Sequence, residues 1–137
     1  MKFLLDTNVV SEFRKSTASH TVVAWANDVP ADWLCISVVT ILEIETGVLR
    51  VERRDPIQGR LMRDWFENFV LNTFFDRTLI IDTSIARQFA KLHVPEPKGE
   101  RDAFIAATAL VHNLTLVTRN TKDFATTGVR LLNPWEP

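Results

Sequence analysis

The sequence predicts an α/β protein in which a parallel β-sheet is covered by helices on both faces, giving three α/β/α layers. Short apolar runs alternate with helix-like segments from one end of the chain to the other, which is typical of strand–helix–strand units. The chain has 137 residues and contains no internal repeat or low-complexity segment. We therefore expect a single domain over residues 1–137.

The predicted elements follow the apolar runs and the polar residues that bound them. The first strand ends at Asp6, and Thr7 and Asn8 are suited to capping the helix that follows. The second strand ends at Ser37 before a long helix, and the fourth ends at Thr118. The predicted strands are residues 3–5, 34–37, 79–81, 115–118 and 129–132. The predicted helices are residues 8–13, 21–27, 38–50, 59–75, 84–93 and 101–113.

The composition is that of a globular protein and excludes several other classes. The chain is 46% hydrophobic and 24% charged with a net charge of −1, which argues against disorder and against a uniformly basic surface. No export signal is predicted, because Asp6 interrupts a very short apolar N-terminus. The longest uncharged run, residues 103–118, has 16 residues and is too short to span a membrane. The single cysteine, Cys35, excludes an internal disulfide, so we expect a cytoplasmic protein.

Four acidic residues lie where a parallel sheet binds its ligands, near the carboxyl ends of the strands. Asp6 directly follows the first strand. Asp102 falls on the apolar stripe of helix 101–113, which predicts a carboxylate on the buried face of the helix. The alternative is that Asp102 only caps the helix or forms an ion pair with Arg101 or another basic residue. Glu43 flanks the apolar stripe of helix 38–50, where an ordinary surface position is the simpler interpretation. Asp123 follows the fourth strand and is equally suited to capping a short turn.

A sheet ordered 3-2-1-4-5 would bring these four carboxylates together above the first strand. Two carboxylates about 4 Å apart repel by about 4 kcal/mol at an effective dielectric of about 20, so such a group needs a cation or large pKa shifts. The ligands are all oxygen, and no Cys or His cluster accompanies them, so we expect Mg²⁺ or Mn²⁺. Such an ion polarises a phosphoryl oxygen and activates water, which predicts hydrolysis of phosphate esters.

The sequence resembles the PIN-domain ribonucleases, and among them the VapC-type toxins of type II toxin–antitoxin pairs, over essentially the whole chain. Four segments carry the resemblance: FLLDTN at residues 3–8, TILEIETG at 40–47, DAFIAATA at 102–109 and LVTRNTKDF at 116–124. It implies a PIN fold with strand order 3-2-1-4-5 and a Mg²⁺- or Mn²⁺-dependent endoribonuclease that hydrolyses RNA phosphodiesters. It also implies a cognate VapB-type antitoxin that neutralises the toxin, a homodimer, and a heterotetramer or larger assembly with that antitoxin.

The resemblance also implies a set of site residues. Asp6, Glu43 and Asp102 match the three core acids and Asp123 the fourth, although some relatives carry the fourth acid where this chain has Asn120. On this interpretation the ion bridges Asp6 and Asp102 to the scissile phosphate, and Glu43 holds or deprotonates the attacking water. Thr7 and Thr118 are expected to orient these ligands through hydrogen bonds.

Two other functions fit these residues less well. A phosphatase that uses Asp6 as a nucleophile is disfavoured, because Asn8 stands where that chemistry needs a second acid. A catalytically inactive PIN-like module that only binds RNA or a partner is disfavoured by the four intact acids. The three histidines are too far apart in sequence to indicate a zinc site or a Ser-His-Asp arrangement.

Basic and apolar residues predict how RNA and the antitoxin would bind. Cations near the proposed site are expected to grip flanking phosphates, although an ordinary surface role is the simpler interpretation for any one of them. These cations are Arg14, Lys15, Arg101, Arg119 and Lys122. Helix 59–75 has more large apolar side chains than one helix face needs, so part is expected to be core. The resemblance implies that the remainder forms, with helix 38–50, a groove for an antitoxin helix.

Overall fold

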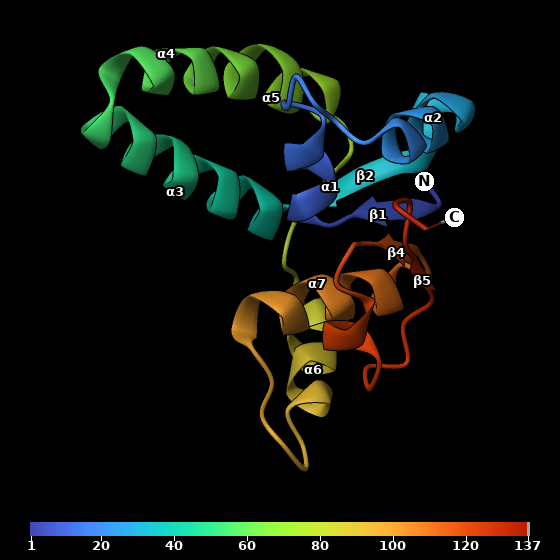
Figure 1. Cartoon of the computed structure of the whole chain (residues 1–137). Helices are drawn as coiled ribbons and strands as arrows, with labels where there is room; N and C mark the ends of the chain where they lie inside the picture. The colour runs from blue at the N-terminus through green and yellow to red at the C-terminus, as the bar shows by residue number, and fades with distance from the viewer. Residues whose placement is uncertain (137) are drawn as a thin grey trace.

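A computed structural model describes residues 1–136 as a five-stranded parallel sheet covered by helices on both faces (Figure 1). The strands are β1 (Phe3–Leu5), β2 (Leu34–Ser37), β3 (Thr78–Leu79), β4 (Thr115–Val117) and β5 (Leu131–Leu132). Their order is β3-β2-β1-β4-β5, and each neighbouring pair is parallel. The predicted fold class and strand order are confirmed, and β1, which leads into Asp6, lies at the centre of the sheet.

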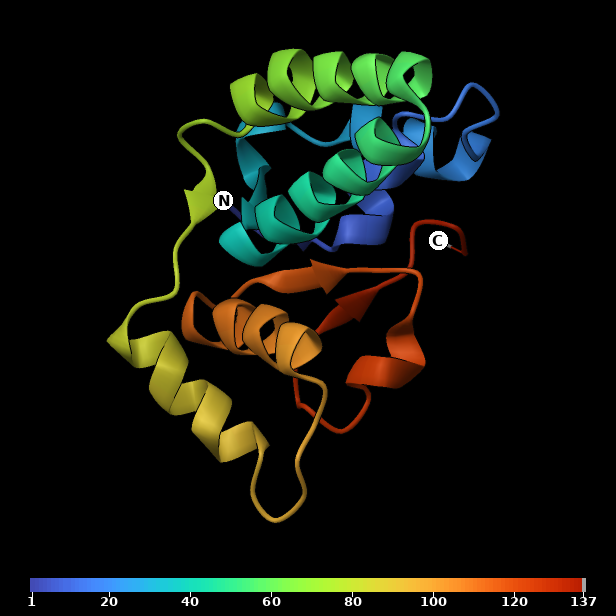
Figure 2. The same cartoon turned by 90° about the vertical axis from the view of Figure 1, so that its left-hand side faces the viewer.

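Seven α-helices of the described residues connect the strands. They are α1 (Thr7–Glu12), α2 (His20–Asp28), α3 (Val38–Arg54), α4 (Pro56–Trp65), α5 (Leu71–Thr73), α6 (Thr83–Leu92) and α7 (Glu100–Val111). A π-helical segment, η2 (Phe66–Val70), joins α4 to α5, and the short 3₁₀ turns are η1 (Ala31–Trp33) and η3 (Thr121–Phe124). Figures 1 and 2 show α1–α5 on one face of the sheet and α6 and α7 on the other. None of the helices among residues 1–136 has the length and apolar character needed to cross a bilayer.

Alternate strand residues point into two apolar cores. Leu5, Ile36 and Val117 belong to the core shared with α1–α5. Leu4, Cys35 and Leu116 belong to the core shared with α7 and η3. Complete burial of a large aliphatic side chain contributes about 1.5–3 kcal/mol, so this alternation fixes which face of each strand meets which layer. Burial raises the pKa of the Cys35 thiol to about 11, in agreement with a packing role.

Most elements differ from the predicted segments by one or a few residues at their ends; α3, for example, continues to Arg54, and β3, β5 and helix 59–75 also differ in extent. Ser37 pairs with Leu79 where β2 ends, so Ile80 and Ile81 have no strand residue beside them and are exposed. β5 is likewise shorter than predicted and pairs with β4 only through Leu131 and Leu132. The predicted helix 59–75 begins earlier, at Pro56, because the Asp55 side chain accepts hydrogen bonds from two backbone N–H groups of its first turn.

The helices α3 and α4 form a hairpin that projects from the body of the protein (Figure 1). Gly59 permits their close approach, since a Cβ atom there would lie 2.5 Å from the Glu52 Cα atom. Arg63 Nη2 lies 2.7 Å from Glu45 Oε2 and 3.0 Å from Glu52 Oε1, which ties α4 to α3. The two helices are therefore held against each other along the hairpin.

The apolar residues of 59–75 divide as expected into core and surface. The buried members are Phe66, Val70 and Phe74, and the exposed members are Leu61, Phe69 and Phe75. Met62 and Trp65 are half-buried and pack against the α1–α5 core. A mainly apolar hollow of about 170 Å³ lies beside Phe69, but α2 supplies its other wall through Val23 and Ala26. The open apolar surface at this hollow therefore lies between α2 and η2–α5.

Candidate active site

Asp6 occupies the position that joins the end of β1 to the start of α1. Its carboxylate caps α1 by accepting a hydrogen bond from the Thr7 backbone N–H at 2.8 Å. The side chain is only 6% exposed. Burial raises the pKa of Asp6 above its ordinary value, and the charges of Asp102 and Glu43 raise it further, whereas the hydrogen bonds from Thr118 and Thr7 act in the opposite direction. A buried carboxylate of this kind is costly unless its charge is satisfied.

Thr118, at the end of β4, holds the other oxygen of Asp6. Its buried hydroxyl donates to Asp6 Oδ2 at 2.7 Å and accepts from the backbone N–H of Asn120 at 3.0 Å. The Asn8 side chain donates to the same hydroxyl at 3.4 Å. One hydroxyl therefore connects the ends of β1 and β4, and the hydrogen bond expected of Thr118 is confirmed.

Glu43 is oriented by a second pair of threonines. It lies on α3, whose first turn is capped by the Ser37 side chain. Thr7 Oγ1 lies 2.7 Å from Glu43 Oε1, to which it donates, and 3.0 Å from Thr40 Oγ1. Thr40 is completely buried, so this contact anchors the Thr7 hydroxyl between α1 and α3.

Asp102 does not lie on the buried face of its helix, and that prediction is wrong. Ile105, Ala106 and Ala109 are buried as the stripe predicts, but Asp102 in the first turn of α7 is exposed. It lines a hollow at the carboxyl ends of β1 and β4 in place of packing on the sheet. Partial desolvation there raises the pKa of Asp102, and the negative charges of Asp123 and Glu43 raise it further.

The structure brings three of the four predicted acids to one hollow of about 280 Å³. Its lining residues are Asp6, Thr7, Asn8, Ser11, Glu43, Asp102 and Asn120. Asp123 lies in η3 and lines a neighbouring hollow of about 330 Å³, which shares Asn120 with the first. Asn120 therefore holds the position beside the three acids, and Asp123 acts on Asp102 through its charge.

The donor set of the hollow suits a hard divalent cation. Every side-chain donor available there is an oxygen or an amide, and the negative charges of neighbouring carboxylates raise the pKa values of Asp6 and Asp102. Across residues 1–136, no three His, Cys, Asp or Glu side chains are already gathered closely enough to enclose an ion. Mg²⁺ usually keeps several waters and binds through one or two carboxylates, so an open set of acids fits it better than it fits a closed zinc-type site.

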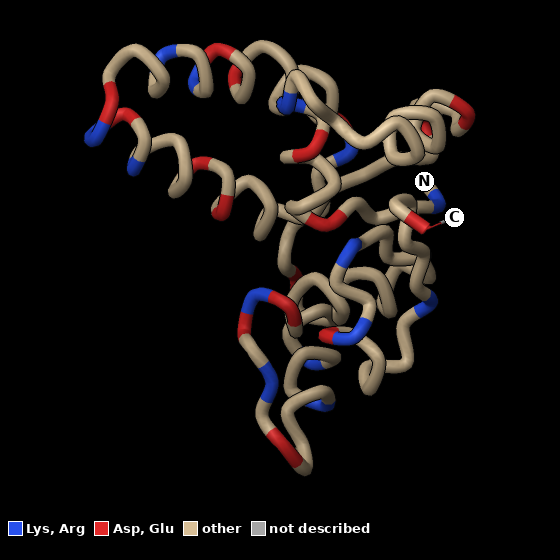
Figure 3. Tube along the Cα trace, in the orientation of Figure 1, with Lys and Arg blue, Asp and Glu red and all other residues tan. Residues whose placement is uncertain are grey.

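The five predicted RNA-gripping cations have different environments. Lys15 Nζ lies 3.0 Å from Glu12 Oε1, and Arg101 Nη1 lies 3.8 Å from Glu43 Oε2. Arg119 and Lys122 line the neighbouring hollow, and within residues 1–136 neither has a carboxylate oxygen within 4.0 Å of its charged group. Arg14 lines neither hollow. Figure 3 shows that acidic and basic positions are interspersed along the trace, in keeping with the net charge of −1.

Two residues of the site were not predicted from the sequence. Thr40 stands three positions before Glu43, which places both on one side of α3, and this spacing was an available signal. Ser11 stands four positions after Thr7 on α1 and also lines the hollow. A lone hydroxyl on a helix is usually a surface group, so neither spacing by itself indicates a site.

Comparison with known proteins places this chain in one family. The PIN domain family matches residues 3–129. The VapC ribonuclease Y4jK of Sinorhizobium fredii is 34% identical over 98% of both chains. The FitAcB crystal structure from Neisseria gonorrhoeae superposes with a TM-score of 0.88 at 32% identity, covering 98% of this chain and 99% of that one. A toxin–antitoxin complex from Klebsiella pneumoniae contains a chain with a TM-score of 0.70 at 27% identity, covering 97% of this chain and 98% of that one. This chain therefore belongs to the PIN domain family and, within it, to the VapC-type ribonuclease toxins of toxin–antitoxin systems.

Proposed function

We propose that this chain is an endoribonuclease that hydrolyses RNA phosphodiesters with Mg²⁺ or Mn²⁺ held by Asp6, Glu43 and Asp102. The observation that carries the proposal is the convergence of these three carboxylates on one hollow. The family supports the ribonuclease activity, and the oxygen donors support the choice of ion. The chemistry that a bound divalent ion supplies is polarisation of the phosphoryl group and a lower pKa for water.

The residues of the chain divide the remaining tasks. Asp6 is held in one orientation by the Thr118 hydroxyl and the Thr7 backbone, so its carboxylate is presented to the hollow without a search over rotamers. Glu43 accepts from Thr7 through Oε1, and its other oxygen, Oε2, lies 3.8 Å from Arg101 Nη1 and would hold the attacking water or accept its proton. Asp102 faces them from the start of α7, and Asp123 adds negative charge behind it.

The test is cleavage of RNA by the full chain and by Asp6→Asn in added Mg²⁺ or Mn²⁺. Loss of a residue that holds the ion removes several kcal/mol of transition-state stabilisation, so we expect turnover to fall at least about 100-fold. Asp28→Asn, an exposed acid at the end of α2, is the matched control and is expected to keep full activity. Undiminished turnover of Asp6→Asn contradicts the proposal. A wild-type chain that binds RNA and metal without cleaving favours the inactive-module alternative.

We also propose that a cognate antitoxin neutralises the toxin by binding the apolar hollow beside Phe69. Phe69 and Val23 are 39% and 36% exposed and lie on opposite walls of that hollow, which would suit apolar side chains of a partner helix. Trp65 stacks on Phe69 with ring centroids 6.3 Å apart and would support it from behind. Phe69→Ala is expected to weaken the toxin–antitoxin complex measured by calorimetry, with exposed Phe75→Ala as the control; equal affinities would exclude this surface.

The assembly of these chains is a further part of the proposal. The resemblance predicts a homodimer, and with antitoxin a heterotetramer or larger complex. Light scattering of the chain alone and of the complex tests both, and a monomer at micromolar concentration would contradict the dimer.

A further inference from the structure

The hollow next to the acids has features of a binding site in its own right. It has a volume of about 330 Å³ and shares Asn120 with the acidic hollow, so the two lie next to each other. Arg119 and Lys122 contribute the positive charge on its wall, and no ion pair within residues 1–136 neutralises them. Three other arginines are engaged within the fold: Arg63 is paired with glutamates, and Arg77 and Arg130 donate to backbone carbonyls. Arg53 and Arg60 also have no ion pair within residues 1–136, but they line neither hollow.

The position of the hollow relative to the acids is fixed by hydrogen bonds. The backbone N–H of Arg119 donates to the Asn8 side chain at 3.4 Å, and that of Asn120 donates to Thr118 at 3.0 Å. The Arg119 guanidinium lies over the Trp135 ring, 5.1 Å from its centroid. The loop that carries both cations is thus attached to the same Thr118 hydroxyl that orients Asp6.

The mixture of charges in this hollow indicates the kind of ligand it takes. An isolated anion would be repelled by Asp123 and Glu136, which also line it. A nucleotide carries both an anionic phosphate, which suits Arg119 and Lys122, and a base whose amino groups donate to carboxylate acceptors. RNA is read in this way where its bases are unpaired.

We infer that this hollow is the subsite for the RNA nucleotide next to the scissile phosphate, with Arg119 and Lys122 holding its phosphate. The inference rests on the proposed ribonuclease function and adds the path of the substrate strand. In this arrangement the cations offset the repulsion that the acidic hollow exerts on the RNA backbone. Arg119 and Lys122 are therefore binding residues, and neither takes part in the chemical step.

The experiment measures binding of a fluorescein-labelled 12-nucleotide RNA of mixed sequence by anisotropy, in Ca²⁺, with intactness of the RNA checked on a gel. Arg119→Ala and Lys122→Ala are each expected to weaken binding up to about fivefold, the value typical of an exposed charge pair. For single-stranded RNA, each lost phosphate contact reduces the magnitude of the slope of log K against log salt concentration by about 0.7. The slope of the double variant should therefore be smaller in magnitude by about 1.4. In Mg²⁺ the KM for cleavage should rise while kcat stays the same.

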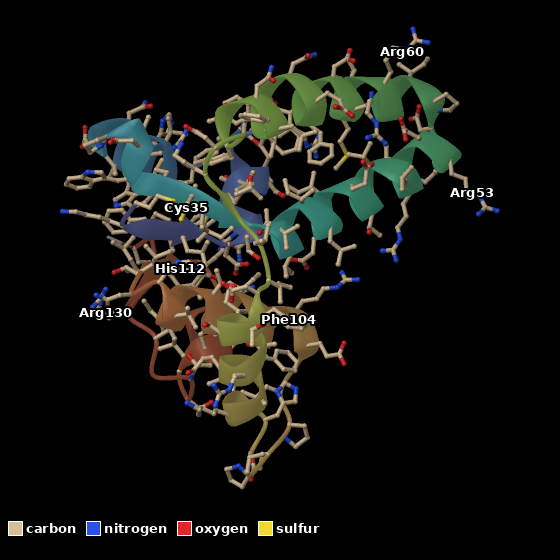
Figure 4. All side chains as sticks on the ribbon, turned by 180° about the vertical axis from the view of Figure 1, so that it is seen from behind. Cys35, Arg53, Arg60, Phe104, His112 and Arg130 are labelled. Carbon is tan, nitrogen blue, oxygen red and sulfur yellow. The ribbon has the colours of Figure 1, made fainter. Side chains whose placement is uncertain are left out.

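The matched control is Arg53→Ala. Figure 4 shows Arg53 and Arg60 at the end of the α3–α4 hairpin, pointing away from the rest of the molecule. The control should leave both affinity and salt slope at the wild-type values. The inference is overturned if the two test variants keep the wild-type salt slope, or if Arg53→Ala lowers it equally.

One further variant and two outcomes distinguish failure of the proposed subsite from failure of the proposed ribonuclease function. Lys122 is exposed and its side chain makes no hydrogen bond among residues 1–136, so Lys122→Glu is expected to fold and to weaken binding more than Lys122→Ala. Wild-type binding with the predicted slopes but without cleavage refutes the ribonuclease and leaves the subsite intact. Wild-type cleavage with unchanged KM in both variants refutes the subsite alone.

Discussion

Replacing Thr118 with valine tests whether one buried hydroxyl holds the central carboxylate. Valine keeps nearly the same shape but loses the bond to Asp6 Oδ2, 2.7 Å long, and the acceptor for the Asn120 N–H. Because a hydrogen bond to a charged group contributes about 1.5–3 kcal/mol, we expect the free energy of unfolding at neutral pH to fall by about that amount. With an unfolding entropy of about 2.1 cal/mol/K per residue, this corresponds to a melting temperature about 5–10 °C lower.

The pH dependence of this loss distinguishes it from a packing defect. The Thr118 bond lowers the pKa of Asp6, so its removal raises that pKa further above the ordinary value. The lost bond is worth most where Asp6 is ionised, and the difference between the two proteins should therefore shrink as pH falls through the pKa range of Asp6. For the same reason the acidic limb of the cleavage profile should move to higher pH.

Urea unfolding of the metal-free proteins from about pH 4 to pH 8 measures the effect. Thr108→Val is the control, because Thr108 is equally buried but its hydroxyl donates to the neutral Phe104 carbonyl at 2.7 Å. The free energy of unfolding of Thr108→Val should be about 0.5–1.5 kcal/mol lower than that of the wild type at every pH. If Thr118→Val loses no more than Thr108→Val, or if its loss does not vary with pH, the assignment of Thr118 to Asp6 is wrong.

Two further predictions concern the metal and the α3–α4 hairpin. Mg²⁺ at ten times its Kd should increase the free energy of unfolding by about 1.4 kcal/mol, which raises the wild-type melting temperature by about 5 °C. The melting temperature of Asp6→Asn should not change. A wild-type melting temperature that stays constant up to millimolar Mg²⁺ contradicts a metal site shared by the acids. Gly59→Ala places a Cβ atom 2.5 Å from the Glu52 Cα atom and should destabilise the chain by about 1–3 kcal/mol. In the control Gly47→Ala, the added Cβ atom lies 3.7 Å from the Met62 Cε atom, and we expect α3 to be stabilised by about 0.5–1 kcal/mol. If urea unfolding gives similar changes in the free energy of unfolding at both glycines, the close approach of the helices at Gly59 is refuted.

The fold and most of the site were predictable because they depend on local patterns that the topology then brings together. Asp6 follows the central strand directly, so the strand order alone places it at the edge where ligands bind. The start of α4 at Pro56 is also indicated by the sequence, because Asp55 is a favoured N-cap residue and proline is favoured in the first helical turn. The pattern of apolar residues alone does not mark this start.

The exposure of Asp102 was not predictable from the periodicity of its helix. A stripe analysis treats every position on one side of a helix as equally covered. Ile105 and Ala106 are covered because they lie against the sheet, whereas the turn that carries Asp102 stands over the hollow at its edge. The length of the strand beneath a helix decides this difference, and a single sequence does not specify it to within one turn.

The same topology explains why Asn120 and Asp123 have different positions relative to the acidic hollow. The backbone N–H of Asn120 donates to Thr118, which keeps this residue at the hollow that Asp6 and Asp102 also line. Asp123 follows a further turn along η3, so its carboxylate lines the neighbouring hollow and reaches Asp102 through its electric field alone. An acid at position 120 would therefore add a fourth carboxylate to the hollow lined by Asp6, Glu43 and Asp102. Asp123 instead adds negative charge to the neighbouring hollow and acts on Asp102 through that charge. Because that boundary is attached to one buried hydroxyl at the end of β4, a change at Thr118 is expected to disturb both the acids and the loop that carries Arg119 and Lys122.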